Sequence, residues 1–241
     1  MNLLSMHGIS KSFRGLKAIA EVSFDVPQGG IVGLIGPNGA GKTTIFNMIA
    51  GVYAPDSGEI IFNQKRIQAL RPDQVCAAGI GRTFQIVKPF AGLSVLDNVI
   101  VGALQREASV PGAKRLSLRI LEKLGLAAKR DLPASSLTLP DRKRLEVARA
   151  LATRPRLLLL DEVMAGLRPK ECDLLVEVFR DINRYEGLTI LLIEHVMRAV
   201  MALARRIVVL HHGEVIARGA PEQVVRDPAV LECYLGEETE V

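Results

Sequence analysis

The residues with the clearest chemistry form one short segment near the N-terminus. Residues 36–43 read Gly-Pro-Asn-Gly-Ala-Gly-Lys-Thr, which fits the pattern G-x-x-x-x-G-K-[ST] at every fixed position. Glycines let successive backbone N–H groups turn inward and form a nest for anions. Lys42 would bring a point charge to terminal phosphates, and the Thr43 hydroxyl can ligate Mg²⁺. The segment therefore predicts a binding site for a nucleoside triphosphate.

The segments on either side of this loop support the same prediction. The run Ile31–Ile35 is short, apolar and rich in β-branched residues, so it predicts a buried strand. Thr44–Ala50 predicts a helix, which Gly51 is placed to end. A strand, a glycine-rich loop and a helix form the context in which the pattern makes a phosphate site.

A second group with chemical potential follows a run of leucines. Leu157–Leu160 predicts a strand buried on both faces of a parallel sheet, and Asp161 and Glu162 come directly after it. Ligands of open α/β folds bind at the carboxyl ends of such strands. Burying two carboxylates there would cost several kcal/mol without a metal ion or a reacting group nearby. We therefore predict that this pair forms a metal and catalytic site.

Two isolated polar residues follow other predicted strands. Gln85 ends the predicted strand Ile80–Phe84, where a glutamine is often only a polar residue at a sheet edge. His195 follows the predicted buried strand Thr189–Ile193, and a lone histidine more often has a structural role. This strand comes next in the chain after the acidic pair and its helix, so we predict that His195 faces the same site.

Composition narrows the class of protein without choosing a partner. The chain has 241 residues, 49% of them hydrophobic, which suits one large α/β domain with an attached lobe or two small domains. The net charge of +5 fits phosphates, an anionic membrane face or nucleic acid, and equally a solvated basic surface. No apolar run reaches the roughly 18 to 20 residues that span a bilayer, and no signal peptide is visible. Three widely spaced cysteines, Cys76, Cys172 and Cys233, predict ordinary thiols in a reducing cytoplasm.

The other elements are predicted from periodicity and turn residues. Residues 3–26 alternate polar and apolar positions, which indicates antiparallel strands, and Phe13 on them would either pack in the core or stack on an adenine ring. Residues 86–135 are predicted to be mostly helical. The predicted helices are Ser94–Val101 and Ala113–Leu124, separated by Pro111-Gly112; Asp141–Ala152, with Asp141 as N-cap; Pro169–Tyr185; and short helices over Pro221–Leu235. Ile207–His211 and Val215–Arg218 predict a hairpin, and the acidic tail 236–241 is predicted to be loose.

The order of these motifs, together with the helix sequence VARAL, resembles the ATP-binding cassette (ABC) ATPases over essentially the whole chain. GRTFQ (81–85), MAGLRP (164–169), LLIEHVM (191–197) and APEQVVRDPAVLECYLGE (220–237) look like the ATP-binding subunits of branched-chain amino acid importers. The resemblance implies an α/β P-loop NTPase with a mainly parallel core sheet, an N-terminal antiparallel β-subdomain and a helical lobe. It further implies a single domain over 1–241, with its core in 1–85 and 153–241 and its lobe in 86–152.

The resemblance also implies a role for each candidate residue. Phe13 would stack on adenine, Gln85 would touch Mg²⁺ and the attacking water, Asp161 would hold Mg²⁺ through water, Glu162 would act as general base, and His195 would contact the γ-phosphate. Thr43 would ligate Mg²⁺, and two such subunits would sandwich two ATP molecules. The residues expected to cradle the nucleotide are Gly36, Asn38, Gly39, Ala40, Gly41, Lys42, Thr43 and Thr44, with Thr138 acting from the partner's side.

The sequence departs from the family pattern at two places. The family signature L-S-G-G-Q is replaced by Leu137-Thr138-Leu139-Pro140-Asp141. Pro140 has no N–H to offer a γ-phosphate, and Asp141 adds negative charge near one. Losing a charge-assisted hydrogen bond costs about 1.5–3 kcal/mol. Arg168 also stands where Asp or Asn is usual, so we expect a weaker sandwich or pairing with a second cassette subunit whose signature is intact.

The function implied is that of an ATP-hydrolysing, energy-coupling subunit of an importer for branched-chain or related hydrophobic amino acids. It would lie at the cytoplasmic face of the inner membrane, with permease subunits inserting a short helix near residues 86–100 and a periplasmic binding protein as an indirect partner. The alternatives are a lipid- or lipopolysaccharide-export ATPase and a weakly hydrolysing regulatory subunit. A nucleic-acid-associated cassette would need tandem cassettes or a coiled-coil insertion, and the chain has neither, so no nucleic acid is expected.

Overall fold

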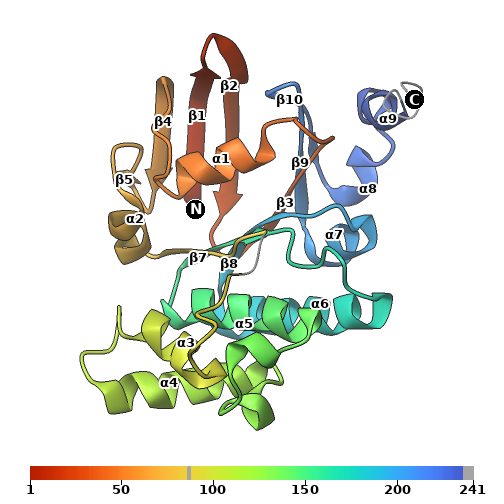
Figure 1. The fold of residues 1–241 in the computed structure, drawn as a ribbon. Coiled ribbons are helices and arrows are strands. Elements are labelled where there is room, and N and C mark those ends of the chain that lie inside the picture. Colours follow the sequence, from red (N-terminus) through yellow and green to blue (C-terminus); the bar gives the residue numbers. More distant parts are fainter. Residues whose placement is uncertain (86–87, 236–241) are drawn as a thin grey trace.

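The computed structural model describes residues 1–85 and 88–235. Its first layer is an antiparallel sheet in the order β2-β1-β4-β5 (Figure 1). Alternating burial along β1 and β2 places one face of this sheet in the core, as the alternation of the sequence predicts. Its strands are β1 (Asn2–Phe13), β2 (Leu16–Pro27), β4 (Ser57–Phe62) and β5 (Lys65–Arg66).

The second layer is a six-stranded sheet in the order β10-β9-β3-β8-β7-β6. Its strands are parallel except for β10, which pairs with β9 in an antiparallel hairpin. Every residue of β3, β7 and β8 is buried, which agrees with their uninterrupted apolar sequences. The strands are β3 (Ile31–Ile35), β6 (Ile80–Arg82), β7 (Leu157–Asp161), β8 (Thr189–Ile193), β9 (Arg206–His211) and β10 (Glu214–Gly219).

The helices cover these sheets and extend beyond them. α3, α4 and α5, which belong to the predicted helical lobe, lie together at the end of the molecule away from the antiparallel sheet (Figure 1). The helices are α1 (Lys42–Ile49), α2 (Pro72–Ala78), α3 (Val95–Ala103), α4 (Val110–Lys123), α5 (Leu139–Ala152), α6 (Pro169–Glu186), α7 (Met197–Leu203), α8 (Pro221–Val224) and α9 (Pro228–Leu235). This arrangement confirms the predicted fold class.

Two hydrophobic clusters hold the layers together. One cluster fills the space between the antiparallel sheet, α1 and one face of the core sheet, with Met6, Phe46 and Leu191 among its members. The other joins the opposite face of the core sheet to α3 to α7, and includes Leu145 and Phe179. The two faces of the core sheet are thus both covered, and the carboxyl ends of its strands are fixed relative to α5.

Three local predictions are wrong or need adjustment. The N-cap of α5 is Thr138 and not Asp141, which lies in the first turn of the helix. Pro111 and Gly112 do not separate two helices: they form the first turn of α4 behind the N-cap Ser109, where a missing N–H costs little. β6 ends at Arg82 rather than at residue 84. The predicted loose tail 236–241 lies outside the described residues.

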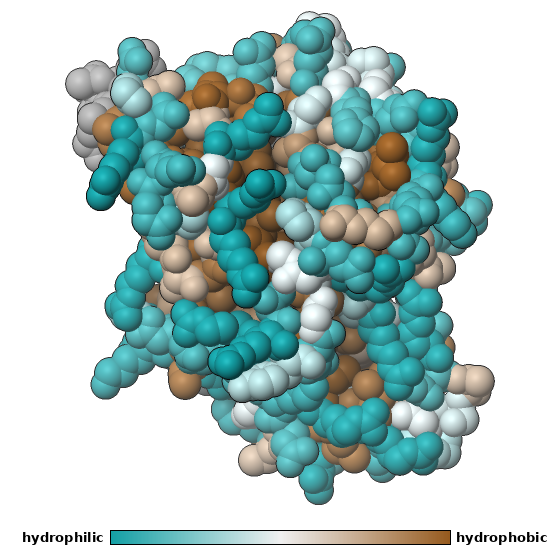
Figure 2. Space-filling model, turned by 180° about the vertical axis from the view of Figure 1, so that it is seen from behind, coloured by the Kyte–Doolittle hydropathy of each residue, from teal (hydrophilic) through white to brown (hydrophobic). Residues whose placement is uncertain are grey.

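Within residues 1–85 and 88–235, no helix is long and apolar enough to cross a bilayer. Seen from behind, hydrophilic side chains predominate, with smaller apolar patches between them (Figure 2). As predicted, the cysteines are buried or half-buried thiols: Cys172 and Cys233 are buried and Cys76 is half-buried.

Candidate functional site

The glycine-rich loop leaves β3 in a conformation that few residues other than glycine can adopt. Gly36 has a φ of 148°, and a Cβ atom there would lie 2.0 Å from the Leu210 carbonyl oxygen of β9. Gly41 has a φ of 102°, and its Cβ would lie 2.9 Å from the Ala18 carbonyl oxygen of β2 and 2.5 Å from the end of the Ile19 side chain. Both glycines are therefore required by close packing of the loop between the two sheets.

The loop wraps around its own lysine. The buried Lys42 ammonium donates hydrogen bonds to the carbonyl oxygens of Gly36 and Pro37, at 2.6 and 2.7 Å. The N–H groups of Gly39 and Gly41 have no acceptor among the residues that the structure describes. Thr43 is exposed in the first turn of α1. Unpaired N–H donors beside an ammonium and a helix N-terminus are the chemistry that an anionic phosphate chain needs.

Glu162 and His195, which the order of strands predicts for one site, come together in the structure with Gln85, which the family resemblance predicts there. The Gln85 amide nitrogen lies 2.6 Å from Oε2 of Glu162, and His195 Nε2 lies 3.0 Å from its Oε1. Glu162 directly follows β7, and its backbone N–H donates to Ile193 at the end of β8, 2.9 Å away. Both carboxylate oxygens are therefore held by side chains that lie just beyond the ends of the neighbouring strands β6 and β8.

Asp161 has a partner that the sequence analysis missed. Arg82, at the end of β6, lies 2.9 Å from Oδ2 of Asp161 and 2.6 Å from Oδ1 of Asn47 on α1. Its guanidinium lies over the rings of Phe46 and Phe84, at 5.9 and 5.3 Å from their centroids. The contact depends on the parallel register of β6 against β7, in which Arg82 pairs with Leu159, two residues before Asp161.

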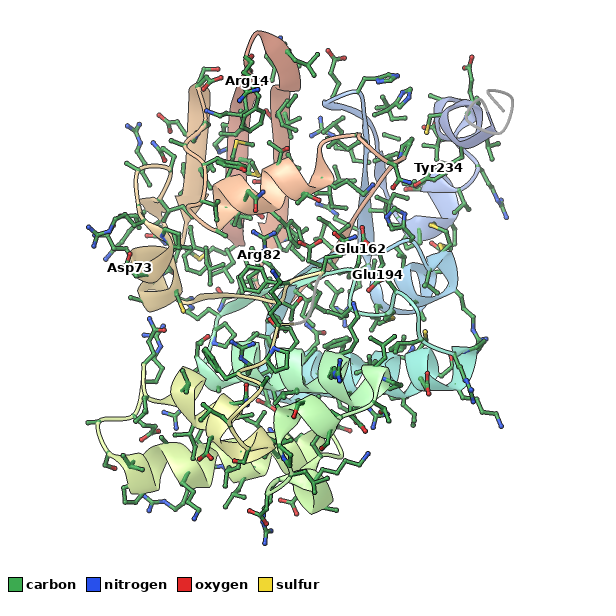
Figure 3. All side chains as sticks on the ribbon, viewed as in Figure 1. Arg14, Asp73, Arg82, Glu162, Glu194 and Tyr234 are labelled. Carbon is green, nitrogen blue, oxygen red and sulfur yellow. The ribbon has the colours of Figure 1, made fainter. Side chains whose placement is uncertain are left out.

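Two further charged groups lie behind Glu162. Lys143 of α5 and Glu194, the residue before His195, are 4% and 2% exposed. Burial raises the pKa of Glu194 to about 7, aided by nearby Glu162 and opposed by a hydrogen bond from the Met164 backbone and by Lys143. Burial lowers the pKa of Lys143, because it disfavours the charged form, while the surrounding carboxylates act to raise that pKa. Figure 3 shows Arg82, Glu162 and Glu194 near the centre of the molecule.

Phe13 and Thr138 lie apart from the Glu162 cluster. Phe13 is 37% exposed and meets Tyr53 edge to face, with 5.2 Å between the ring centroids. Thr138 donates to Oδ2 of Asp141 at 2.9 Å, and the same oxygen pairs with Lys129. No hydrogen bond, ion pair or ring contact within the described part of the chain joins either residue to Glu162.

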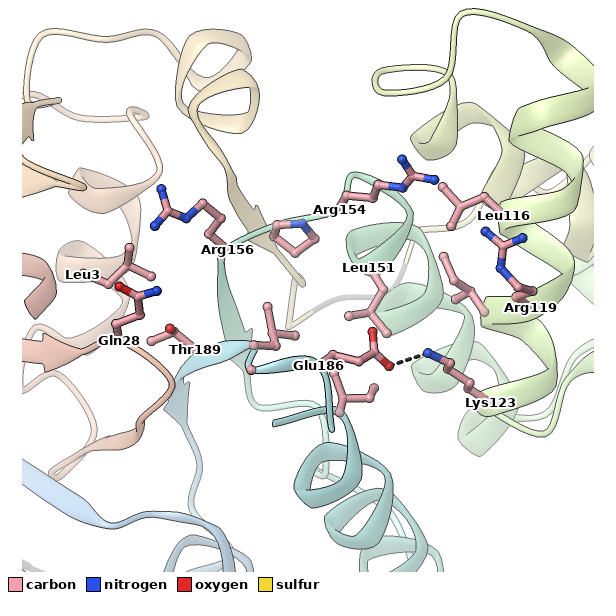
Figure 4. Close-up of a pocket in the computed structure, with 15 residues that line it drawn as sticks. Leu3, Gln28, Leu116, Arg119, Lys123, Leu151, Arg154, Arg156, Glu186 and Thr189 are labelled. Carbon is pink, nitrogen blue, oxygen red and sulfur yellow. Dashed lines mark hydrogen bonds and ion pairs between the residues drawn. The ribbon is translucent and has the colours of Figure 1, made fainter. Parts of the chain in front are cut away.

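Of two cavities, one lies beside this arrangement and the other lies at the far end of the core strands. One of about 270 Å³ lies between α2, β6, α3 and α5, and is lined by the exposed side chains of Val52, Phe84, Phe90 and Val101 with Glu146 and Arg149. The other, of about 500 Å³, lies at the opposite ends of the core strands, around Arg156 and Thr189 (Figure 4). The ion pair of Lys123 with Glu186 crosses this cavity from α4 to α6. The phosphate loop lies at the other end of the core strands.

Comparison with known proteins agrees with this geometry. The family model described as "ABC transporter" matches residues 19–165, and the model "Branched-chain amino acid ATP-binding cassette transporter" matches residues 214–240. The high-affinity branched-chain amino acid transport ATP-binding protein LivG of Salmonella typhimurium is 38% identical, over 98% of both chains. The lipopolysaccharide export system ATP-binding protein LptB of Acidithiobacillus ferridurans is 36% identical over 99% of both chains.

A solved structure gives the same result for the fold. The ADP conformation of MJ1267, an ATP-binding cassette of an ABC transporter, has a TM-score of 0.89 and 31% identity, covering 98% of this chain and 99% of that one. Fold and site together define a nucleotide-binding cassette that hydrolyses ATP. The chain belongs to the ATP-binding proteins of ABC transporters. The predicted family and enzyme class are thereby confirmed.

Replacing Glu194 with Gln should make stability less dependent on pH. The raised pKa means that folded protein binds the Glu194 proton more tightly than unfolded protein, so stability is lost as pH rises from 4.5 to about 7. The amide keeps an acceptor for the Met164 N–H without a charge. We expect the free energy of unfolding of E194Q to exceed that of the wild type by about 3 kcal/mol at pH 8 and by little near pH 4.5, measured by urea unfolding at both pH values. The exposed variant E222Q is the control; equal differences at both pH values would contradict the prediction.

Proposed function

We propose that this protein is the ATP-hydrolysing, energy-coupling subunit of an importer for branched-chain or related hydrophobic amino acids, at the cytoplasmic face of the inner membrane. The observation that carries the hydrolytic part is the Glu162 carboxylate, held between Gln85 and His195 at the end of β7. The substrate class is supported by the names of relatives such as LivG, and by the match of residues 214–240 to the branched-chain amino acid cassette model.

In this proposal the phosphate loop and the Glu162 cluster act on the same triphosphate. The loop from Gly36 to Thr44 cradles the phosphates through its N–H groups, and Lys42 exchanges the loop carbonyls for phosphate oxygens. Glu162 accepts a proton from the attacking water, while His195 contacts the γ-phosphate. Phe13 stacks on adenine, and its edge contact with Tyr53 fixes the orientation of its ring.

The residues present fit a magnesium ion. Among 1–85 and 88–235 no group of three His, Cys, Asp or Glu side chains could hold a metal alone. Mg²⁺ in nucleotide sites instead uses few protein ligands together with waters and phosphates. Thr43, Gln85 and, through water, Asp161 would hold it, and it would neutralise charge on the phosphate oxygens. In this structure Arg82 occupies one oxygen of Asp161.

The 270 Å³ cavity is the proposed docking groove for a permease. Its exposed wall residues Val52, Phe84, Phe90 and Val101 present an apolar surface beside the Glu146–Arg149 ion pair. A short amphipathic helix from a membrane partner would bury these side chains. We propose that residues 1–85 and 153–241 act as the core and 86–152 as the lobe, so that the groove lies at their junction. A periplasmic binding protein would act through the permease, and no nucleic acid is involved.

The altered signature supports pairing with a second, different cassette subunit. Pro140 occupies the second position of α5 and has no N–H, and the Thr138 hydroxyl is engaged by Asp141. Burial would raise the pKa of Asp141, but hydrogen bonds from Lys129 and Thr138 outweigh it and keep the carboxylate ionised. In a head-to-tail dimer this end of α5 would face the partner's nucleotide with fewer donors than usual.

Glu162→Gln should abolish most turnover while leaving nucleotide binding intact. The amide cannot accept the proton of water, so the steady-state rate of phosphate release should fall by about 10²-fold or more. The affinity for Mg-ATP, measured by calorimetry, should change little because the loop is untouched. The exposed variant Glu177→Gln controls for a general effect of losing a carboxylate. Wild-type turnover in E162Q would reject Glu162 as the base.

Mixing this chain with a cassette subunit that has an intact L-S-G-G-Q should raise ATPase activity by about tenfold or more over this chain alone. The donors missing at Pro140 are supplied by the partner, and one charge-assisted hydrogen bond is worth about that factor. The gain should vanish when E162Q replaces the wild-type chain in the mixture. Equal specific activity alone and mixed would remove the pairing hypothesis.

Deleting the gene should abolish high-affinity uptake of radiolabelled leucine by whole cells. A wild-type copy should restore uptake and an E162Q copy should not, because transport depends on hydrolysis. The relative LptB motivates the alternative of lipopolysaccharide export. Normal leucine uptake together with loss of surface lipopolysaccharide would favour that alternative.

A further inference from the structure

Lys143 connects α5 to the hydrolytic site through the main chain. Its ammonium donates hydrogen bonds to the carbonyl oxygens of Gln85 and Glu162, at 3.2 and 3.0 Å. Lys143 is only 4% exposed. It belongs to α5, a helix of the predicted lobe, but its ammonium contacts residues of the predicted core. One buried cation on α5 therefore touches the backbones of two residues on separate segments of the core.

The position of Lys143 is not explained by charge pairing alone. Four carboxylates, those of Glu194, Glu162, Asp161 and Glu146, act on it electrostatically. Its two hydrogen bonds nevertheless go to main-chain carbonyls rather than to these carboxylates. An ammonium that is fixed by carbonyl groups determines where those backbones lie, in addition to offsetting negative charge.

The backbone of Glu162 is an arrangement that needs such support. Its φ is +49°, in the left-handed region that costs a non-glycine residue about 1–3 kcal/mol unless its surroundings hold it. Its N–H donates to Ile193 and its C=O accepts from Lys143, so both polar groups of the residue are fixed. This conformation places the carboxylate between Gln85 and His195.

Two more charged residues on the same face of α5 hold the chain around Gln85. Glu146 accepts a hydrogen bond from the Phe84 backbone, and Arg149 donates to the Lys88 carbonyl at 3.2 Å. The Arg149 guanidinium also covers the Phe90 ring, 4.9 Å from its centroid. Because residues three apart lie on one helix face, Lys143 continues this row to the catalytic glutamate.

We propose that Lys143 is a positioning residue for ATP hydrolysis, which aligns Glu162 and Gln85 only when α5 is seated against the core. The seating of α5 thereby sets the geometry of the base, and Glu146 and Arg149 extend the same connection to the groove. The inference rests on the proposed role of Glu162 as base. It concerns Lys143 as a group that acts through the backbones of other residues and does not touch the substrate.

The first test compares Lys143→Met with Lys143→Arg. We expect K143M to lower kcat for ATP by at least tenfold with KM changed by less than about threefold, since the phosphate loop is untouched. K143R keeps cationic donors and should recover most of kcat. Lys114→Met, on the exposed face of α4, is the control. Wild-type kcat in K143M would overturn the proposal, as would a rise in KM that accounts for the whole loss.

A second variant separates positioning from simple charge balance. K143M leaves buried Glu194 without its cation, which by itself would destabilise the fold. In K143M/E194Q that charge is removed, and the Tm should return to the value of E194Q. The kcat of the double variant should remain at least tenfold below that of E194Q. If kcat recovers together with Tm, Lys143 only neutralises Glu194 and the proposal fails.

The two proposals fail in different ways. Turnover that survives in E162Q would reject Glu162 as the base, and with it the role of Lys143 in positioning that base. Inactive E162Q combined with fully active K143M would leave the function standing and overturn this inference alone.

Discussion

Negative charge at the carboxyl ends of β7 and β8 is the constraint that organises this structure. Asp161 is the last residue of β7, and Glu162 and Glu194 follow the adjacent buried strands β7 and β8. Such groups are costly to bury without compensation. The strands themselves are apolar and cannot provide that compensation. The cations come from elsewhere, Arg82 from the edge strand β6 and Lys143 from α5. The charges of the site therefore bind β6, at the edge of the sheet, and α5 to the centre of the molecule.

The strands, the phosphate loop and the meeting of Glu162 with His195 could be predicted from the residues themselves, whereas Gln85 was expected there only from the family resemblance. Apolar runs of five residues indicate buried parallel strands, and parallel strands bring their carboxyl ends to one edge. The conformation of the loop is fixed by glycines that pack against β9 and β2. These features depend on local pattern and on one rule of topology, both of which are readable in a single chain.

The partners of the acidic residues could not be predicted in the same way. Arg82 lies 79 residues before Asp161, and their contact depends on the register of β6 against β7. Lys143 reaches Glu162 only through the packing of α5 on the core, which periodicity does not specify. The N-cap of α5 is likewise not decided by the local sequence. Threonine and aspartate are both good caps, and the proline between them fits the first turn behind Thr138.

The structure changes the meaning of the altered signature. Asp141 does not project its charge from the helix end, because its carboxylate is turned toward Lys129 and the Thr138 hydroxyl. What distinguishes this chain at that end is therefore the missing donor of Pro140 more than an added negative charge. The chain thus combines the hydrogen-bonded group around Glu162 with an N-terminal end of α5 that offers fewer hydrogen-bond donors than the family signature would.

The row Lys143, Glu146 and Arg149 also limits how cassettes can exchange parts. Each of these side chains contacts a group outside α5: Lys143 the Glu162 carbonyl, Glu146 the Phe84 backbone, and Arg149 the Lys88 carbonyl and the Phe90 ring. A chimaera that takes α3 to α5 from a relative, but keeps segment 84–90 of this chain, would combine contact surfaces that belong to different proteins and need not match. Recombination between related transporters would then preserve function most readily where both surfaces are inherited as one block, and a one-residue deletion within α5 would rotate the whole row away from its contacts.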